Sequence, residues 1–293
     1  MRPAGQGGGV GAGRGDSRSG PGVGPIGAAR AWLHSCVAAF GFLTVFGSPV
    51  VPSPESLSWF PFVGAILGCA LGSLWWAAGR VLPATVAAAV VVVADLALTG
   101  MLHFDGLCDS ADGLLGHMDA GRRLEVMREP GVGAWGVAAG ASMLGLRWVA
   151  LASLQPSLLL VAGLWCMSRS VMALAAVSLP YARSDGGLLS VFRASEPSSG
   201  SGDVPVVLPS PPSPPAATLM TRMALCVPGI AGAVVLLEAW RPVHGVEVLA
   251  ACAVSGVAVV MRARRAIGGV TGDVLGAMGV VLETVGLVAA TLR

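Results

Sequence analysis

The sequence contains no lysine, and charged residues of every type are scarce. Asp, Glu, Lys and Arg make up 12% of the 293 residues, about half the fraction in an ordinary soluble domain, and all eighteen basic residues are arginine. Without lysine the chain cannot form a Walker-type phosphate loop, which ends in Gly-Lys-Ser or Gly-Lys-Thr. The net charge of +2 is too small to indicate a nucleic-acid partner.

Cysteine is also sparse, and the six cysteines form no close pairs. Most of them lie inside apolar runs, where a free cysteine behaves as a small hydrophobic residue. The set is Cys36, Cys69, Cys108, Cys166, Cys226 and Cys252. This distribution argues against a zinc site and against a disulfide framework.

Long apolar runs dominate what is present. Segments 59–79 and 81–101 are long enough to cross ~30 Å of hydrocarbon as helices. Runs of similar character are found at 134–154, 157–179, 219–239, 243–261 and 274–292. We therefore predict an all-α, polytopic integral membrane bundle with about seven transmembrane helices.

Two polar segments have little to bury. Residues 1–30 are rich in Gly, Ser and Arg and predict a disordered tail, which leaves a membrane domain over 31–293. Within that domain, the Pro- and Ser-rich stretch 194–217 predicts a flexible loop. Segment 31–46 is only borderline apolar. Its composition fits an extra interfacial or re-entrant helix, and also a crossing one.

The arginines predict the orientation of the bundle. If the tail lies inside and the seven spans alternate, the outer side receives only Arg80, Arg241 and Arg293. The inner loops then collect Arg122, Arg123, Arg128, Arg183, Arg193, Arg222, Arg262, Arg264 and Arg265. This asymmetry follows the positive-inside rule. It places the polar loop 102–133 on the cytoplasmic side of the cell membrane.

Small and charged residues inside the predicted spans indicate how the helices pack. Glycines recur every four residues in two places, a spacing that lets membrane helices approach closely. They are Gly64, Gly68 and Gly72, and Gly268, Gly272 and Gly276. Asp95, Arg147 and Arg169 also fall within spans, so each is expected to face the bundle interior and to need a partner or a wet cavity.

Three aspartates follow the second predicted span. Asp105, Asp109 and Asp112 are spaced by four and three, so they share one face if the helix continues past His103. Like charges at these spacings destabilise a helix by a few tenths of a kcal/mol per pair, which a bound cation would offset. Oxygen ligands without sulfur suit Mg²⁺, Mn²⁺ or Ca²⁺. The alternative is a solvated acidic helix end.

Basic and glycine-containing segments surround these aspartates. Arg122, Arg123 and Arg128 offer planar guanidinium groups to phosphate oxygens, although they also suit membrane anchors. His103 can bind metal or phosphate, or only cap the span. Two further polar stretches, at 181–187 and 267–273, fall on the same side of the bundle. Three polar patches on one side of a membrane bundle can converge on one cavity.

A glycine pattern at Gly131, Gly133 and Gly136 matches the dinucleotide fingerprint literally. No strand is predicted before it, and a membrane span follows it. We therefore exclude a Rossmann site.

Taken together, these motifs resemble the cobalamin synthase family, the adenosylcobinamide-GDP ribazoletransferases, which are integral membrane enzymes. The similarity begins near residue 31 and runs to the end of the chain. It is carried by Trp59–Gly64, Thr99–Leu114, Arg123–Arg128, Ser168–Arg169, Tyr181–Arg183, Gly268–Ala277 and Glu283. Glu129–Gly131 departs from the family pattern and puts a basic substrate contact there in doubt.

The resemblance implies a Mg²⁺-dependent transfer that joins adenosylcobinamide-GDP to α-ribazole, or to its 5′-phosphate, and releases GMP. Its partners are then these small molecules and membrane lipid. Asp105, Asp109 and Asp112 are the expected metal ligands, with Asp109 and Asp112 as catalytic residues. The expected substrate-binding residues are His103, Arg122, Arg123, Arg128, Arg169, Arg183, Gly269, Thr271 and Asp273.

Two other classes of membrane protein also carry clustered carboxylates. A CDP-alcohol phosphotransferase also uses aspartates on membrane helices, but its signature needs Ala-Arg soon after the first Asp-Gly, whereas Leu-Cys-Asp follows Asp105-Gly106 here. A cation transporter would place carboxylates near the membrane midplane, in broken helices paired between two repeats. No convincing repeat is seen.

Overall fold

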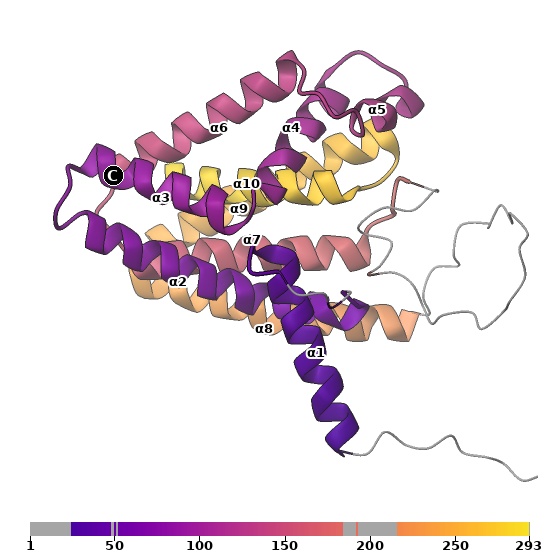
Figure 1. The fold of residues 1–293 in the computed structure, drawn as a ribbon, viewed down its shortest axis with the longest axis horizontal. Coiled ribbons are helices and arrows are strands. Elements are labelled where there is room, and N and C mark those ends of the chain that lie inside the picture. The colour runs from indigo at the N-terminus through magenta and orange to yellow at the C-terminus, as the bar shows by residue number, and fades with distance from the viewer. Residues whose placement is uncertain (1–24, 48–49, 51, 184–191, 193–215, 293) are drawn as a thin grey trace, which may run out of the picture.

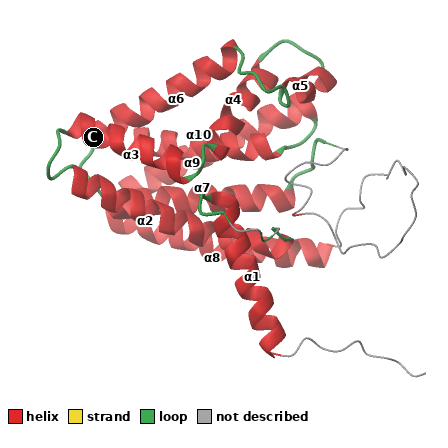
Figure 2. Cartoon of the chain, in the orientation of Figure 1, coloured by secondary structure: helices red, strands yellow, loops and turns green. Residues whose placement is uncertain are grey.

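The computed structural model describes residues 25–47, 50, 52–183, 192 and 216–292, and every regular element in these ranges is helical (Figure 2). The elements are α1 (Pro25–Leu43), η1 (Pro54–Trp59), α2 (Phe60–Ala78), α3 (Ala84–Leu98), α4 (Leu102–Leu115), α5 (Ala120–Val126), α6 (Ala134–Ser153), α7 (Leu158–Ser178), α8 (Ala216–Trp240), α9 (His244–Ile267) and α10 (Gly272–Ala289). The predicted all-α class is confirmed.

A helix lies in each of the seven predicted spans, and the long helices run roughly side by side (Figure 1). Five of the described helical segments are long and apolar enough to cross a membrane, and the bent pair α3–α4 adds a sixth. The described apolar part of α8, Cys226–Trp240, is shorter. The chain is therefore a polytopic helical membrane protein.

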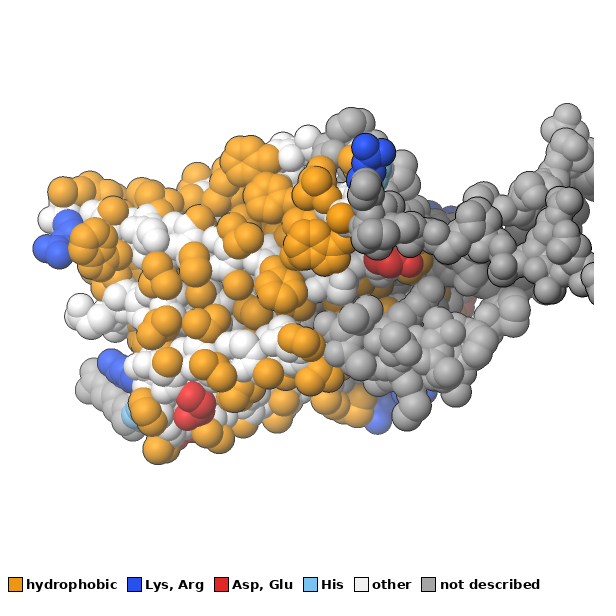
Figure 3. All heavy atoms as spheres, turned by 90° about the horizontal axis from the view of Figure 1, so that it is seen from below, with side chains coloured by type: hydrophobic (Ala, Val, Ile, Leu, Met, Phe, Trp, Pro, Cys, Tyr) orange, Lys and Arg blue, Asp and Glu red, His pale blue; other side chains and the backbone are white. Residues whose placement is uncertain are grey.

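The outer surface of the bundle is apolar. Figure 3 shows hydrophobic side chains along the length of one face and charged side chains mainly near its ends. Exposed residues of this kind include Val93 on α3, Val149 on α6 and Val254 on α9. A soluble protein rarely exposes so much contiguous apolar surface, whereas the hydrocarbon of a bilayer accommodates it.

Glycines bring α2 into close contact with α7, as their spacing predicts. A Cβ atom on Gly64 would lie 2.4 Å from the Trp165 carbonyl oxygen, and one on Gly68 would lie 2.6 Å from the Ala162 Cα. At Gly72 the corresponding distance to the Leu158 Cα is 2.7 Å. Since no side chain fits at these distances, α2 needs glycine at each of these positions.

Helix α1 runs across the direction of the long helices and projects from the bundle (Figure 1). It is not among the described helices long and apolar enough to span a membrane. Trp32 and Leu33 are exposed, and the Trp32 ring lies 4.4 Å from the Trp59 ring of η1. Of the alternatives for 31–46, these features favour an interfacial helix.

The predicted tail and loop fall largely outside the described residues. Of the segment 1–30, the structure describes only residues 25–30, which form the first turns of α1. Of the predicted loop at 194–217, it describes only Ala216 and Ala217, where α8 begins.

Candidate active site

The helix of the second span ends before the aspartates begin. Gly100 and Met101 have φ angles of 58° and 61°, and the axis turns by 89° between α3 and α4. Two consecutive left-handed residues cannot continue an α-helix. The second span and α4 are therefore two separate helices. A helix does continue past His103, because α4 covers Leu102–Leu115, so the spacing of the aspartates defines one face as predicted.

Asp105, Asp109 and Asp112 lie along that face of α4 with increasing burial. Asp105 is exposed, Asp109 is half-buried and Asp112 is buried. Asp105 and Asp112 both repel negative charge on Asp109, and so does Asp273 of α10, whereas Arg183 attracts it. The open end of this face thus carries a concentration of negative charge.

Asp273 reaches this face because α4 and α10 meet at a glycine. A Cβ atom on Gly106 would lie 2.8 Å from the Asp273 carbonyl oxygen. The Asp273 carboxylate accepts a hydrogen bond from the Arg183 guanidinium at 2.7 Å and one from the Thr271 hydroxyl at 3.2 Å. Three residues predicted to bind substrate are therefore in direct contact beside the aspartates.

The two polar stretches that carry these residues pair with each other. Val270 donates its backbone N–H to the Pro180 carbonyl at 2.9 Å, and Ala182 donates to the Val270 carbonyl at 3.0 Å. A Cβ atom on Gly269 would lie 2.4 Å from the Pro180 oxygen, so only glycine allows this approach. The structure thus brings the predicted patches at 181–187 and 267–273 together, as far as residue 183.

The third aspartate faces the start of α6. Asp112 accepts hydrogen bonds from the backbone N–H groups of Gly133 at 2.7 Å and of Gly136 at 2.9 Å. A Cβ atom on either glycine would lie within 2.6 Å of a carboxylate oxygen. The pattern that imitates a dinucleotide fingerprint therefore lets the N-terminus of α6 approach the carboxylate of Asp112.

Arg123 is turned away from the acidic face toward the end of α4. Its Nη1 donates to the carbonyls of Gly113 and Leu114, each at 2.8 Å, and its Nε donates to Met118 at 2.9 Å. Arg262 of α9 also donates to Leu114. These contacts satisfy carbonyls that the last turn of a helix leaves free. The guanidinium of Arg123, predicted to contact phosphate, binds backbone here.

The other arginines near α5 are more open. Arg122 is half-exposed and pairs with Glu125 at 3.1 Å and with Glu129 at 2.8 Å. Arg128 is exposed at the end of the same segment. Asp119 caps α5 by accepting the Arg122 backbone N–H, and this hydrogen bond lowers the pKa of the Asp119 carboxyl below its usual value.

A separate set of charges is buried between the spans. Asp95 of α3 accepts a hydrogen bond from Arg147 of α6 at 2.5 Å and one from the Trp165 indole of α7 at 3.0 Å. The other end of the Arg147 guanidinium donates to Glu283 of α10 at 2.9 Å. Asp95 and Arg147 face the interior, as predicted, and each has a partner.

Glu283 extends this set to α7. Its second oxygen accepts hydrogen bonds from Arg169 and from the Ser168 hydroxyl, the latter at 2.7 Å. Asp95, Arg147, Glu283 and Arg169 thus form a chain of alternating sign, and no member is more than 6% exposed. We call these four residues the buried ionic chain. Sequence reasoning gave Glu283 no role, although an acid inside the last span signals such a partner.

His103 lies by the buried ionic chain and not by the acidic face. Along a helix the three aspartates are rotated from it by roughly 180° to 240°, since each residue adds about 100°. His103 is 5% exposed and lines a small cavity together with Asp95, Arg147, Arg169 and Glu283. The structure therefore separates His103 and Arg169 from the other predicted substrate contacts.

No group of three His, Cys, Asp or Glu residues within the described ranges is arranged to hold a metal ion. What the acidic face offers is Asp105 and Asp109, one helical turn apart, with Asp273 close enough to act on Asp109. Mg²⁺ takes only a few carboxylates and fills its other positions with water and substrate phosphate. The oxygen donors present therefore fit Mg²⁺.

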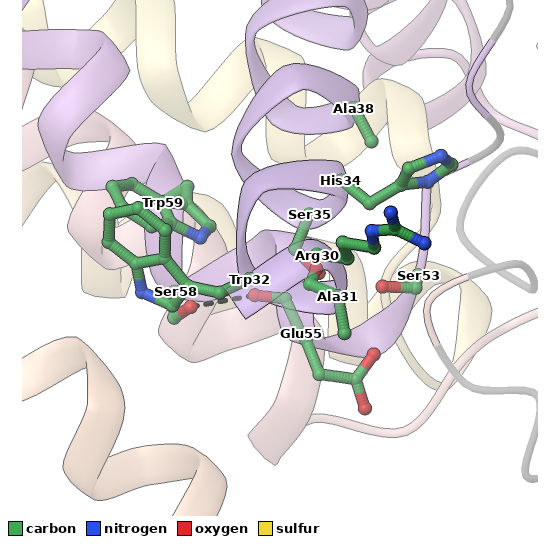
Figure 4. Close-up of a pocket in the computed structure, with 10 residues that line it drawn as sticks. All are labelled: Arg30, Ala31, Trp32, His34, Ser35, Ala38, Ser53, Glu55, Ser58 and Trp59. Carbon is green, nitrogen blue, oxygen red and sulfur yellow. Dashed lines mark hydrogen bonds between the residues drawn. The ribbon is translucent and has the colours of Figure 1, made fainter. Parts of the chain in front are cut away.

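A cavity of about 470 Å³ lies elsewhere, between α1 and η1. Figure 4 shows Trp32 and Trp59 together on one side of it, and Arg30 and His34 on the other. None of the predicted site residues lines this cavity.

The fold and the acidic face define a polytopic membrane protein with a polar site at one end of a helical bundle. The chain belongs to the family described as Cobalamin-5-phosphate synthase, which matches residues 35–291. No solved structure gives a significant match.

Curated relatives cover most of the chain. A protein of Chlorobium phaeovibrioides is 34% identical over 257 residues, which are 86% of this chain and 94% of that protein. One of Chlorobium chlorochromatii is 35% identical, over 84% of this chain and 90% of its own. One of Roseiflexus is 31% identical, over 87% and 88%. Each is named adenosylcobinamide-GDP ribazoletransferase. The family assignment predicted from the sequence motifs is confirmed.

Proposed function

We propose that this chain joins adenosylcobinamide-GDP to α-ribazole, or to α-ribazole 5′-phosphate, with release of GMP in a Mg²⁺-dependent reaction. The family membership supports the activity, because its relatives carry the name of this transferase. The acidic face of α4 supports the metal dependence, because cleavage of a diphosphate builds up negative charge that a divalent cation offsets.

Asp105 and Asp109 would hold the metal. Their carboxylates stand one turn apart at the open end of α4, where Asp109 is also repelled by Asp273. Bound Mg²⁺ would supply electrostatic stabilisation of the diphosphate oxygens and of the leaving phosphate. This arrangement of carboxylates is the observation on which the proposal depends.

The reaction needs one bond made and one broken. A hydroxyl oxygen of α-ribazole attacks the phosphorus that carries the cobinamide, and the bond from that phosphorus to the bridging oxygen of the diphosphate breaks. The electron pair of that bond leaves with GMP, and the hydroxyl proton passes to a carboxylate of the acidic face. Positioning of the two substrates supplies the rest of the rate increase.

Asp112 was predicted to complete the metal site or to accept this proton. Each of its oxygens already accepts one backbone hydrogen bond from the start of α6. A carboxylate oxygen has two lone pairs, so both roles stay compatible with these bonds. Asp112 therefore stays a candidate ligand or base, and it also fixes α6 against α4.

The segments beside α4 would bind the diphosphate substrate. Thr271 and Arg183 are both hydrogen-bonded to Asp273, and Gly269 lies against the Pro180 carbonyl. We propose that Arg183 orients a phosphate oxygen with the guanidinium nitrogens not engaged by Asp273, since such forks recognise phosphate in two-point contacts. Arg122 and Arg128, exposed on α5 and at its end, would extend the basic rim.

The active site would face the cytoplasm from the cell membrane. The segments with Arg122, Arg183 and Arg262 lie at the α4–α5 end of the bundle, whereas Arg80 and Arg241 lie in the connections at its other end (Figure 1). An excess of arginine marks the cytoplasmic side of membrane proteins. Guanine nucleotides are available there.

Purified protein in lipid vesicles tests the function. Adenosylcobinamide-GDP and α-ribazole are added with Mg²⁺, and GMP and the corrinoid product are measured together by chromatography. We expect equal amounts of both in the presence of Mg²⁺, and neither after chelation with EDTA. GMP release without joining of the two substrates would contradict the transfer, and full turnover in EDTA would contradict the metal requirement.

A further inference from the structure

The small cavity next to the α3–α4 break has polar atoms in its wall that find no hydrogen-bond partner among the described residues. Within the part of the chain that the structure describes, both ring nitrogens of His103 are without a hydrogen-bond partner. The Nε of Arg169 is without one as well. Both residues are at least nine-tenths buried, and both line this cavity. Such groups are normally satisfied in a folded protein, so their convergence indicates a bound polar ligand.

The size of the cavity limits what it can hold. Its volume of about 10 Å³ admits roughly one water-sized molecule. Residues of α3, α4, α6, α7 and α10 form its wall, so the site is enclosed by five helices. A nucleotide, a corrinoid or a phosphate group is therefore too large.

The chemistry of the wall selects among small ligands. The Nε–H of Arg169 is a donor, and at least one ring nitrogen of His103 carries a hydrogen in every protonation state. Asp95 and Glu283 bring carboxylate oxygens, which only accept, to the same cavity. A chloride ion would face these carboxylates, and a metal cation would face the guanidiniums of Arg147 and Arg169. Water both accepts and donates, so it satisfies both sets of groups.

We propose that this cavity is a water-binding site that ties His103 of α4 to Arg169 of the buried ionic chain and thereby positions α4. The water accepts from the His103 ring and from Arg169 Nε–H, and it donates to a carboxylate of the chain. Buried waters of this kind make about three hydrogen bonds and are costly to remove. His103 is a positioning residue, because it lies on the opposite side of α4 from the aspartates.

The site matters for α4 because the helix is interrupted just before α4 begins. With the left-handed residues Gly100 and Met101 at the junction, the regular hydrogen-bond pattern of α3 does not continue into α4, and the junction is closed by turn-type bonds from Met101 N–H to the Leu96 carbonyl at 2.9 Å and from Leu102 N–H to the Thr99 carbonyl at 3.2 Å. On its inner side α4 lies against α10, where a Cβ atom on Gly276 would lie 3.2 Å from the His103 Cα. The link through water adds a polar anchor beside this contact, in the first turn of α4.

A cryo-EM map of the wild-type protein in nanodiscs, at a resolution that shows ordered water, tests the site directly. We expect density within hydrogen-bond distance of the His103 ring and of Arg169 Nε, unchanged when chloride is replaced by bromide. Density that strengthens with bromide, a ring bonded directly to protein atoms, or a cavity without density would each overturn the water site. This measurement does not depend on the proposed function.

Kinetics of His103 variants test the positioning role, which rests on the proposed transferase activity. His103→Leu removes the hydrogen-bonding groups, and we expect kcat to fall by roughly tenfold to a hundredfold while KM for both substrates stays near the wild-type value. His103→Gln keeps a donor and an acceptor, and we expect it to retain most of kcat.

His117 provides the matched control, because it is exposed just after α4. His117→Leu should leave kcat unchanged. Wild-type kcat in His103→Leu, or an equal loss in His103→Gln, would overturn the positioning role. If the wild-type protein itself released no GMP, the proposed function would fail, while the map would still decide whether water occupies the cavity.

Discussion

Two groups of charged side chains, one at the end of the bundle and one between its spans, differ in balance and in burial. The acidic face brings Asp105, Asp109 and Asp273 near one another, with only Arg183 acting against them in the electrostatics of Asp109. The buried ionic chain alternates in sign from Asp95 to Arg169, so its formal charges cancel. One group leaves charge for a ligand to neutralise, and the other neutralises itself.

This difference separates function from architecture. A charge between membrane spans needs a partner or a wet cavity. The buried ionic chain pairs each of its members and joins α3, α6, α7 and α10. The acidic face is open to solvent at the exposed Asp105. The net negative charge of the open acidic face suits catalysis. The buried ionic chain, whose charges cancel, holds together the helices around that face.

The largest effect is expected where the unbalanced cluster is disturbed. Asp109→Asn removes one proposed metal ligand and should lower the rate of GMP release by on the order of 10³-fold or more, because electrostatic stabilisation of the developing charge is lost. Thermal stability in detergent should change little, since repulsion among the carboxylates is relieved. Turnover with saturating Mg²⁺ and the unfolding temperature are measured on the same preparation.

Asp119→Asn is the matched control for this substitution. Asp119 is exposed, and it caps α5 through the Arg122 backbone N–H. Asparagine caps a helix about as well as aspartate, so neither stability nor turnover should change. Near-normal activity in Asp109→Asn would remove the basis for the metal site on α4.

A substitution in the buried ionic chain should lower the stability of the protein. Glu283→Gln leaves two buried arginines against one aspartate, and removing one partner from a buried ion pair costs about 3–5 kcal/mol. We expect a corresponding loss in the free energy of unfolding, measured by denaturation in mixed detergent micelles.

Glu247→Gln offers a comparison on α9. Glu247 is exposed and pairs only with His244 at 3.0 Å among the described residues. Surface pairs of this kind contribute at most about 1 kcal/mol. If Glu283→Gln were no less stable than Glu247→Gln, the buried ionic chain would not stabilise the packing of α3, α6, α7 and α10.

A smaller loss of stability is expected where α2 packs beside the buried ionic chain. A Cβ atom on Gly64 would lie 2.4 Å from the Trp165 carbonyl oxygen and 3.1 Å from the Cγ of Arg169. Gly64→Ala should therefore push α2 away from α7 and lower stability by about 1–3 kcal/mol, as overpacking does. The unfolding temperature of the purified protein is the measurement.

Gly145 of α6 serves as the control, because a Cβ atom there would meet nothing within 4 Å. Gly145→Ala should leave stability unchanged or raise it slightly, since alanine restricts the unfolded chain. An equal loss in both variants would mean that the loss in Gly64→Ala does not come from the α2–α7 contact.

Much of the fold could be predicted from the sequence because the bilayer leaves few choices. Within hydrocarbon every backbone polar group needs an internal partner, so a long apolar run such as 157–179 must be helical, and α7 occupies it. The break at Gly100 and Met101 could not be predicted in this way. It falls in a mildly apolar stretch, and hydropathy does not register a change in backbone direction.

The sequence predicts the residue types of the candidate site better than it predicts their contacts. The spacing of Asp105 and Asp109 places them on one face whatever the direction of α4. The spacing also carried a signal that was missed, because His103 falls on the opposite face of any helix that continues to Asp105. The partners of Asp112 and Arg123 were beyond sequence reasoning, since both bind backbone groups exposed at helix ends.

The sequence by itself determined that this is a bundle of membrane helices with an acidic stripe beside its second span, because run length and helical period depend on neighbouring residues only. The tertiary structure alone decided which charges meet. Arg169 and Glu283 are separated by 114 positions, and Arg183 and Asp273 by 90. Whether a carboxylate is neutralised or left for a ligand depends on such distances in space, which no local pattern encodes.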